Sequence, residues 1–167
     1  MKLMNEREAS RLLGYADIDS LLASNLTQRG SKAVQYKLPG QSSKQTVLAK
    51  FLSALFCGEE SCWVQITYWH DDSDANQDLF YGYRSGRGDA RSLRDASVYN
   101  FSPEDANRFI SIVSMVLYFS WDARVFDASG TFSINISHDE VIDCFVLSPV
   151  TLEQLISEFS RLEMRRL

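Results

Sequence analysis

Cysteine and histidine are scarce in this chain, and their scarcity limits the kinds of site that it can build. There are three cysteines, Cys57, Cys62 and Cys144, and two histidines, His70 and His138. An odd number of cysteines, after a start that lacks an apolar signal region, argues against the disulfide framework of a secreted protein. Two histidines and no second close pair of cysteines do not predict a structural zinc site, so we expect no metal and no cofactor.

The chain also lacks a basic surplus and a long apolar run. It has 17 Lys and Arg against 22 Asp and Glu, a formal net charge of −5. Proteins that bind nucleic acid draw much of their affinity from neutralised phosphates, so no nucleic-acid partner is expected. No run reaches the roughly 18 apolar residues of a membrane-spanning helix, which predicts no membrane partner and, with the missing signal region, a cytoplasmic location.

The motifs of several large enzyme classes are absent as well. The sequence contains no P-loop, no Gly-x-Gly-x-x-Gly dinucleotide fingerprint and no Gly-x-Ser-x-Gly nucleophile elbow. Gly86-Arg87-Gly88 is too short a match to indicate any of them. The sequence gives no positive indication of catalysis, and a protein without enzymatic activity is favoured.

Apolar and aromatic residues, by contrast, are plentiful and are patterned for both helices and strands. Hydrophobic residues make up 45% of the chain and charged residues 23%, as expected for one compact domain. We predict a single α+β domain over 1–167, with a helical N-terminal extension over 1–30, a core over 34–165, and a mixed or antiparallel sheet with helices packed on it. Periodicity places helices between 42 and 58, over 74–84, over 103–119 and from 151 to about 162, and strands over 34–38, 62–69, 124–126, 131–136 and 141–147.

The predicted helix over 103–119 should be the most deeply buried. Ser102-Pro103-Glu104 supplies a hydroxyl cap, a proline in the first turn and an acid at the positive end of the helix dipole. Beyond Arg108 its apolar residues lie on nearly all sides, which predicts a central helix. We expect this helix and the following hairpin, which turns at Ser129-Gly130, to present Trp121 and the segment after the second strand at a common edge.

That segment, His138-Asp139-Glu140, contains the candidate catalytic residues. The end of a strand places side chains at the rim of a sheet, and a histidine oriented by Asp139 or Glu140 is suited to act as a general base near neutral pH. The alternative is structural: Asp139 caps the segment that follows, and His138 forms an ordinary hydrogen bond.

Two further segments are rich in charge. His70 stands beside Asp71, Asp72 and Asp74, but these residues lack the glycine and terminal glutamate of a calcium loop, which favours a solvated acidic loop.

The second segment is an arginine-laced connector between Arg84 and Asp95. Its guanidinium groups are suited to hold a phosphate or carboxylate ligand, or else to form ion pairs with aspartates nearby. The residues in question are Arg84, Arg87, Arg91 and Arg94, with Asp78, Asp89 and Asp95 as the alternative partners.

Carboxylates make the C-terminal third of the sequence acidic, above all between 122 and 143, where Arg124 is the single Lys or Arg beside Asp122, Asp127, Asp139, Glu140 and Asp143. Such a field attracts a basic protein surface. Trp69 and Trp121 stand near the ends of predicted strands, and aromatic residues beside carboxylates are typical of binding hot spots. The candidate binding residues are Trp121, Asp122, Trp69, His70, Arg84, Arg91 and Arg94.

Four short motifs resemble an uncharacterised family of small bacterial proteins. The motifs cover roughly residues 34–145, and their most specific part is Trp-Asp-Ala followed by Ser-His-Asp-Glu. The family has a Pro-Gly-His after its Arg-x-Leu-x-x-Ala, where this chain reads Ser97-Val98-Tyr99, so a shared catalytic histidine is not expected there. The motifs are Leu79-Phe80-Tyr81-Gly82-Tyr83-Arg84, Arg91-Ser92-Leu93-Arg94-Asp95-Ala96, Trp121-Asp122-Ala123 and Ser137-His138-Asp139-Glu140.

These observations favour a cytosolic bacterial protein that binds another protein and does not catalyse a reaction. By analogy with other small acidic proteins, an immunity-type inhibitor of a toxin is one form that it would take. The alternatives are an enzyme or a binder of small anions, which would use His138, Asp139 and Glu140 with the Arg84–Arg94 connector, and a homo-oligomeric scaffold.

Overall fold

We describe the protein from a computed structural model. The structure describes residues 1–27, 30–56, 61–69, 74–92, 95 and 97–167. The predicted candidates His70 and Arg94, and most of the acidic loop after His70, lie outside these residues.

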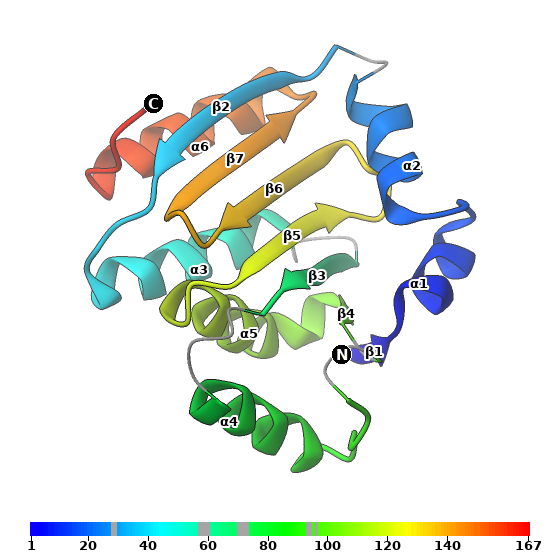
Figure 1. The fold of residues 1–167 in the computed structure, drawn as a ribbon. Coiled ribbons are helices and arrows are strands. Elements are labelled where there is room, and N and C mark those ends of the chain that lie inside the picture. Colours follow the sequence, from blue (N-terminus) through cyan, green and yellow to red (C-terminus); the bar gives the residue numbers. More distant parts are fainter. Residues whose placement is uncertain (28–29, 57–60, 70–73, 93–94, 96) are drawn as a thin grey trace.

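The described strands form one antiparallel sheet, as the α+β prediction requires (Figure 1). Its strand order is β1-β4-β3-β5-β6-β7-β2, so the two strands nearest the N-terminus, β1 and β2, form the opposite edges of the sheet. The strands are β1 (Lys2–Met4), β2 (Lys32–Lys37), β3 (Cys62–Tyr68), β4 (Val98–Phe101), β5 (Asp122–Asp127), β6 (Phe132–Ser137) and β7 (Val141–Val146).

Helices lie on both sides of the sheet but cover the two faces unequally. One face packs against α3, α5 and α6 around a large apolar core, which includes Leu52, Ile112 and Phe159. Within the described residues, the other face meets α1 and α2 at a smaller cluster around Trp63 and Phe126. The helices are α1 (Glu6–Leu13), α2 (Ile18–Leu22), α3 (Ser42–Phe56), α4 (Asp74–Ser85), α5 (Ala106–Tyr118) and α6 (Pro149–Arg161).

The deeply buried helix over 103–119 was predicted correctly, except that its first turn is 3₁₀ and not α-helical. Pro103–Asp105 is a 3₁₀ turn in which Ser102 and Asp105 form a capping box, and α5 follows directly. Phe109, Ile112 and Val116 of α5 are fully buried. The helix therefore packs between the sheet and its neighbours, as its apolar character indicates.

The predicted hairpin between β5 and β6 is also present, and its turn requires glycine. Gly130 has a φ of 66°, a backbone conformation that L side chains rarely adopt. A Cβ at Gly130 would come within 3.0 Å of Leu21 and of Asn25. The turn thus brings the hairpin into close contact with α2 and the segment after it.

Two features of the sequence prediction were wrong. The first 30 residues are not only helical, because β1 belongs to the sheet through its pairing with β4, and neither strand was expected. The last helix begins at Pro149 and not at 151, because its cap is Ser148, whose side chain accepts from the Thr151 amide. Arg165 lies beyond the end of α6, and its carbonyl accepts a hydrogen bond from the Lys37 amide at 2.8 Å.

Within the described residues, no helix has the length and apolar character that crossing a membrane requires.

Candidate functional site

A row of polar side chains crosses the sheet on the face that α3, α5 and α6 leave open. Side chains alternate between the faces of a strand, so the partners that face one another across neighbouring strands share one face. The pairing Gln65 with Arg124, Arg124 with Asn135, Asn135 with Asp143, and Asp143 with Gln35 gives an unbroken row over five strands. We call this row, with the part of the sheet around it, the open face.

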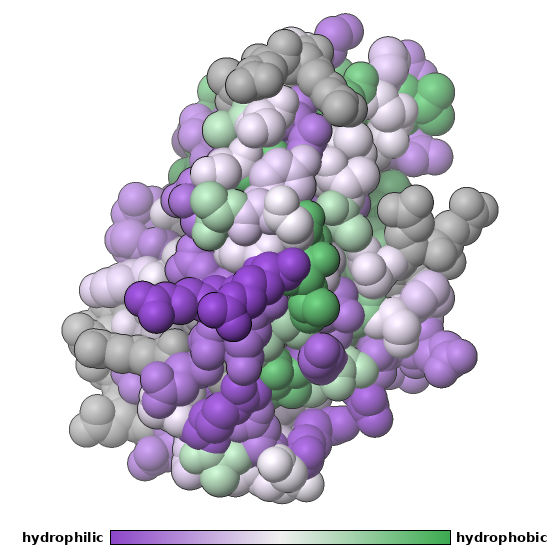
Figure 2. Space-filling model, turned by 90° about the vertical axis from the view of Figure 1, so that its right-hand side faces the viewer, coloured by the Kyte–Doolittle hydropathy of each residue, from purple (hydrophilic) through white to green (hydrophobic). Residues whose placement is uncertain are grey.

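The neighbouring row of the open face continues the polar pattern. Lys37, Val141 and Ser137 are paired across β2, β7 and β6. By the same alternation Asp122 shares the face with Arg124 on β5. Figure 2 shows the side of the molecule that carries α1 and α2, where a band of hydrophobic side chains runs among hydrophilic ones. The polar residues paired across its strands make the open face suited to polar recognition.

Some polar side chains of the row have hydrogen-bond partners, and others have atoms without one. The Gln35 amide donates to Asp143 at 2.7 Å, and Arg124 Nη1 donates to Asp19 of α2 at 2.6 Å. Gln65 Oε1 and Asn135 Oδ1 are buried and have no hydrogen-bond partner in the described part of the chain. Buried polar atoms without partners are rare in folded proteins and call for an explanation.

Two cavities adjoin the Arg124–Asp19 pair, one on each side. The first has a volume of about 520 Å³, and the second, which includes Asn135, has a volume of about 290 Å³. Both have Asp19 and Arg124 in their walls. The pair thus divides a trough that runs across the strands. The first cavity is lined by Glu6, Asp19, Gln65, Ile66, Thr67, Tyr68, Trp69, Gln77, Ser97 and Arg124.

His138 lies in the β6–β7 turn at the end of the open face, and the carboxylate that orients it is Asp122. Asp122 Oδ1 accepts from the His138 backbone amide at 2.6 Å and lies 2.8 Å from Nδ1 of the ring. Asp139 is more distant, at 3.7 Å from Nε2, and Glu140 instead pairs with Lys37 at 3.1 Å. The carboxylate nearest the ring is thus Asp122, which was not proposed for this role, while Asp139 lies beside the other ring nitrogen and Glu140 pairs with Lys37.

The hydrogen bond to Asp122, supported by its negative charge, raises the pKa of His138 above the ordinary 6.5. Because the folded-state pKa is the higher one, this pair stabilises the fold fully below about pH 6.5 and less as pH rises through the folded-state pKa. We expect Asp122→Asn to lower the pKa of His138, as measured by NMR titration of its ring signals. Asp139→Asn is the matched control and should lower it less; an equal or larger drop would contradict the assignment of Asp122.

The two tryptophans proposed as binding residues belong to the core. Trp121 is 1% exposed, and its ring lies 4.8 Å from that of Trp69 and 5.2 Å from that of Phe80. Trp69 is partly buried against the same core. The expected common edge therefore holds only in part: Asp122 meets His138 there, while the neighbouring Trp121 faces inward.

The described arginines of the connector contact other groups of the same part of the chain. Arg84 is 0% exposed, donates to the Arg91 carbonyl at 3.0 Å, and lies 3.5 Å from Asp89. Arg91 binds the same carboxylate, with its Nη2 2.6 Å from Asp89 Oδ2. The hydrogen bond from Arg91 lowers the pKa of Asp89 to about 2. Arg87 stacks over the Tyr83 ring. Of the two interpretations, ion pairing with Asp89 is the one that these contacts support.

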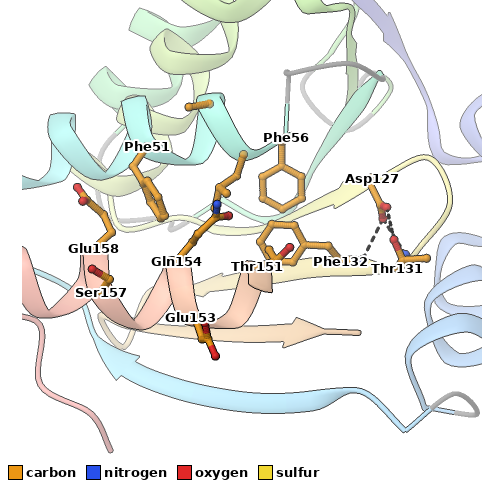
Figure 3. Close-up of a pocket in the computed structure, with 12 residues that line it drawn as sticks. Phe51, Phe56, Asp127, Thr131, Phe132, Thr151, Glu153, Gln154, Ser157 and Glu158 are labelled. Atoms are coloured by element: carbon orange, nitrogen blue, oxygen red, sulfur yellow. Dashed lines mark hydrogen bonds between the residues drawn. The ribbon is translucent and has the colours of Figure 1, made fainter. Parts of the chain in front are cut away.

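A third cavity, which was not predicted, lies between α3 and α6 (Figure 3). It measures about 960 Å³, with Phe51, Phe56 and Phe132 among its apolar walls. Asp127 also borders it, but its carboxylate already accepts from the Thr131 and Phe132 amides. Its walls come from segments far apart in the chain, so no single stretch of sequence contains a signal for it.

The described residues contain no group of three or more His, Cys, Asp or Glu side chains placed to hold a metal ion. Cys62 and Cys144 are buried, and burial raises the pKa of the Cys144 thiol.

The open face can bind complementary polar groups, and the His138–Asp122 pair at its end can exchange a proton. Comparison of the chain with protein-family models, with curated proteins and with solved structures finds no match.

Proposed function

We propose that this chain is a protein-binding protein without catalytic activity, and that its open face receives a basic partner. The observation that carries the proposal is the in-register polar row from Gln35 to Gln65. A sheet face that helices leave open, and that carries polar groups on five adjacent strands, offers many hydrogen-bonding groups to a protein surface.

Charge indicates the kind of partner. Carboxylates border the open face on several sides, and the chain as a whole carries −5. Among them, Asp19 and Glu6 line the larger of its two cavities, Asp143 lies in the row, and Asp139 and Glu140 are exposed at the turn. A partner with a basic surface would be steered toward this face and held by complementary charge. An immunity-type inhibitor in the bacterial cytosol, which neutralises a basic toxin by covering its surface, would work in this way.

The alternative function, an enzyme or a binder of small anions, has weaker support. It needs the guanidinium groups of the connector, yet Arg84 and Arg91 are engaged with Asp89 and with loop carbonyls. The His138–Asp122 pair is its strongest element. A lone histidine–carboxylate pair, however, also occurs as a structural contact.

Recovery of a partner from a lysate of the source organism tests the proposal. We expect the tagged full chain to retain a basic protein at low salt and to lose it near about 0.5 M salt, where charges are screened. Asp143→Lys should reduce recovery about tenfold, which corresponds to about 1.4 kcal/mol of binding free energy.

Glu153→Lys is the control, because it makes the same charge change at an exposed position of α6. It should leave recovery unchanged. Equal recovery by all three proteins, or no recovery at low salt, would refute the proposal, and a loss confined to Glu153→Lys would move the site to the cavity between α3 and α6. The mass of the chain in solution separates a homo-oligomeric scaffold from these cases.

A further inference from the structure

Arg124 sits between two acceptors that it does not satisfy. Its neighbours in the row are Gln65 on β3 and Asn135 on β6. Gln65 is only 7% exposed, and both its Oε1 and Asn135 Oδ1 have no hydrogen-bond partner in the described residues. Adjacent strands lie about 4.8 Å apart, so both amides are within the span of an arginine side chain that lies across the sheet.

The guanidinium of Arg124 is held away from these amides by Asp19. The 2.6 Å bond to Asp19 is an ion pair with a carboxylate that is 79% exposed. Exposed ion pairs contribute little to stability. Another cation that offers Asp19 an equivalent contact can therefore replace Arg124 at little cost in free energy.

The cavity beside Gln65 has the composition of a cation site. It is lined by two carboxylates, Glu6 and Asp19, against the single guanidinium of Arg124. Tyr68, which is 43% exposed, forms part of the wall, and cations bind favourably over aromatic faces. A planar guanidinium satisfies a carboxylate through two parallel hydrogen bonds and stacks on an aromatic ring, which an ammonium group does less well.

We propose that this cavity receives an arginine side chain of the basic partner, an inference that rests on the proposed function. The incoming guanidinium takes over the hydrogen bond of Asp19. Arg124 is released, turns onto the sheet and donates to Gln65 and Asn135. The exchange accounts for two buried acceptors that otherwise have no donor, and it makes the site specific for a partner with an arginine at this position.

Titration of the ¹⁵N-labelled full chain with N-acetyl-L-arginine amide tests the site. We expect saturable shifts of the Arg124 Nε–H and Gln65 side-chain amide signals, with a dissociation constant on the order of millimolar. Asp19→Asn should weaken binding about fivefold or more, and Asp143→Asn, on the same face but outside the cavity, should change it less than about twofold. N-acetyl-L-glutamine amide, which is uncharged, should give no saturable shift. Binding unaffected by Asp19→Asn, or absence of saturable shifts, would overturn the proposal.

The same variant tests the exchange without any ligand. Asp19→Asn leaves the helix cap intact, because the cap of α2 is Asp17. In the ligand-free variant Arg124 has lost its ionic partner, so its Nε–H and the Gln65 amide signals should move toward the positions seen in the ligand-saturated protein. Movement in the opposite direction would disprove the rearrangement.

The two proposals fail separately. If the arginine probe does not bind while Asp143→Lys still reduces partner recovery, the arginine site is wrong and the proposed function stands. If the probe binds as expected and no partner is recovered at low salt, the site stands as a binder of guanidinium groups and the protein-binding proposal is refuted.

Discussion

Replacing Trp121 with alanine is expected to lower the free energy of unfolding by about 3–5 kcal/mol. The indole is 1% exposed and packs against the rings of Trp69, Phe80 and Phe119, with centroids 4.8, 5.2 and 4.9 Å away. Alanine would leave a cavity at the junction of α5 and β5 that rigid neighbours fill only in part. The loss is large compared with the 5–15 kcal/mol that stabilises a typical domain.

Urea denaturation followed by circular dichroism measures this effect. Leu79→Ala is the control, because Leu79 is 63% exposed and its truncation should change stability by less than about 0.5 kcal/mol. A cost below about 1 kcal/mol for Trp121→Ala, together with loss of partner recovery, would restore Trp121 to the binding role that its sequence context suggested.

The inward orientation of Trp121 has a signal in the sequence. Trp121, Ala123 and Val125 occupy alternate positions and are all buried, whereas Asp122 and Arg124 between them are polar. Trp121 directly precedes β5, and the alternation of the strand, extended by one residue, places it on the core face. Proximity to carboxylates in the sequence suggested a binding residue, but period-two alternation puts neighbours on opposite faces.

Long, strongly patterned segments were predictable, and short ones were not. The apolar patterns of α3, α5 and β3 extend over many residues, because each of these elements buries many of its own side chains. β1 and β4 have three and four residues, too few for a period to stand out. Their pairing relies on backbone hydrogen bonds, which any sequence can form.

The candidate site could be predicted from the sequence only in part, for a different reason. Alternation in the strands that contain Gln35 and Asn135 places those side chains on the face of the sheet opposite the large core. The Arg124–Asp19 contact, however, joins positions 105 residues apart. His138 was expected to be oriented by Asp139 or Glu140, yet the carboxylate nearest its ring is that of Asp122 on β5. Contacts across a sheet depend on strand order, and a single sequence does not contain that order.

Asp89 and Arg84 should respond to replacement in opposite ways, although they form one ion pair. Asp89→Ala is expected to cost about 3–5 kcal/mol of unfolding free energy, because it leaves the fully buried guanidinium of Arg84 without a counter-charge. Arg84→Met keeps the apolar stem and removes the charge. It should change stability by about 1 kcal/mol or less, or even increase it, since Nε and Nη1 of Arg84 have no hydrogen-bond partner in the described residues.

Acid denaturation supplies a second measure of the same pair. The hydrogen bond from Arg91 lowers the pKa of Asp89 from 3.8 to about 2. Because the folded-state pKa is the lower one, the carboxylate contributes its full stabilisation above about pH 4, and this contribution disappears as pH falls through about 2. Between these limits the stability of Asp89→Ala should fall less steeply with pH than that of the unmodified chain. Equal steepness, or a greater loss of stability in Arg84→Met than in Asp89→Ala, would show that Asp89 does not compensate the buried charge.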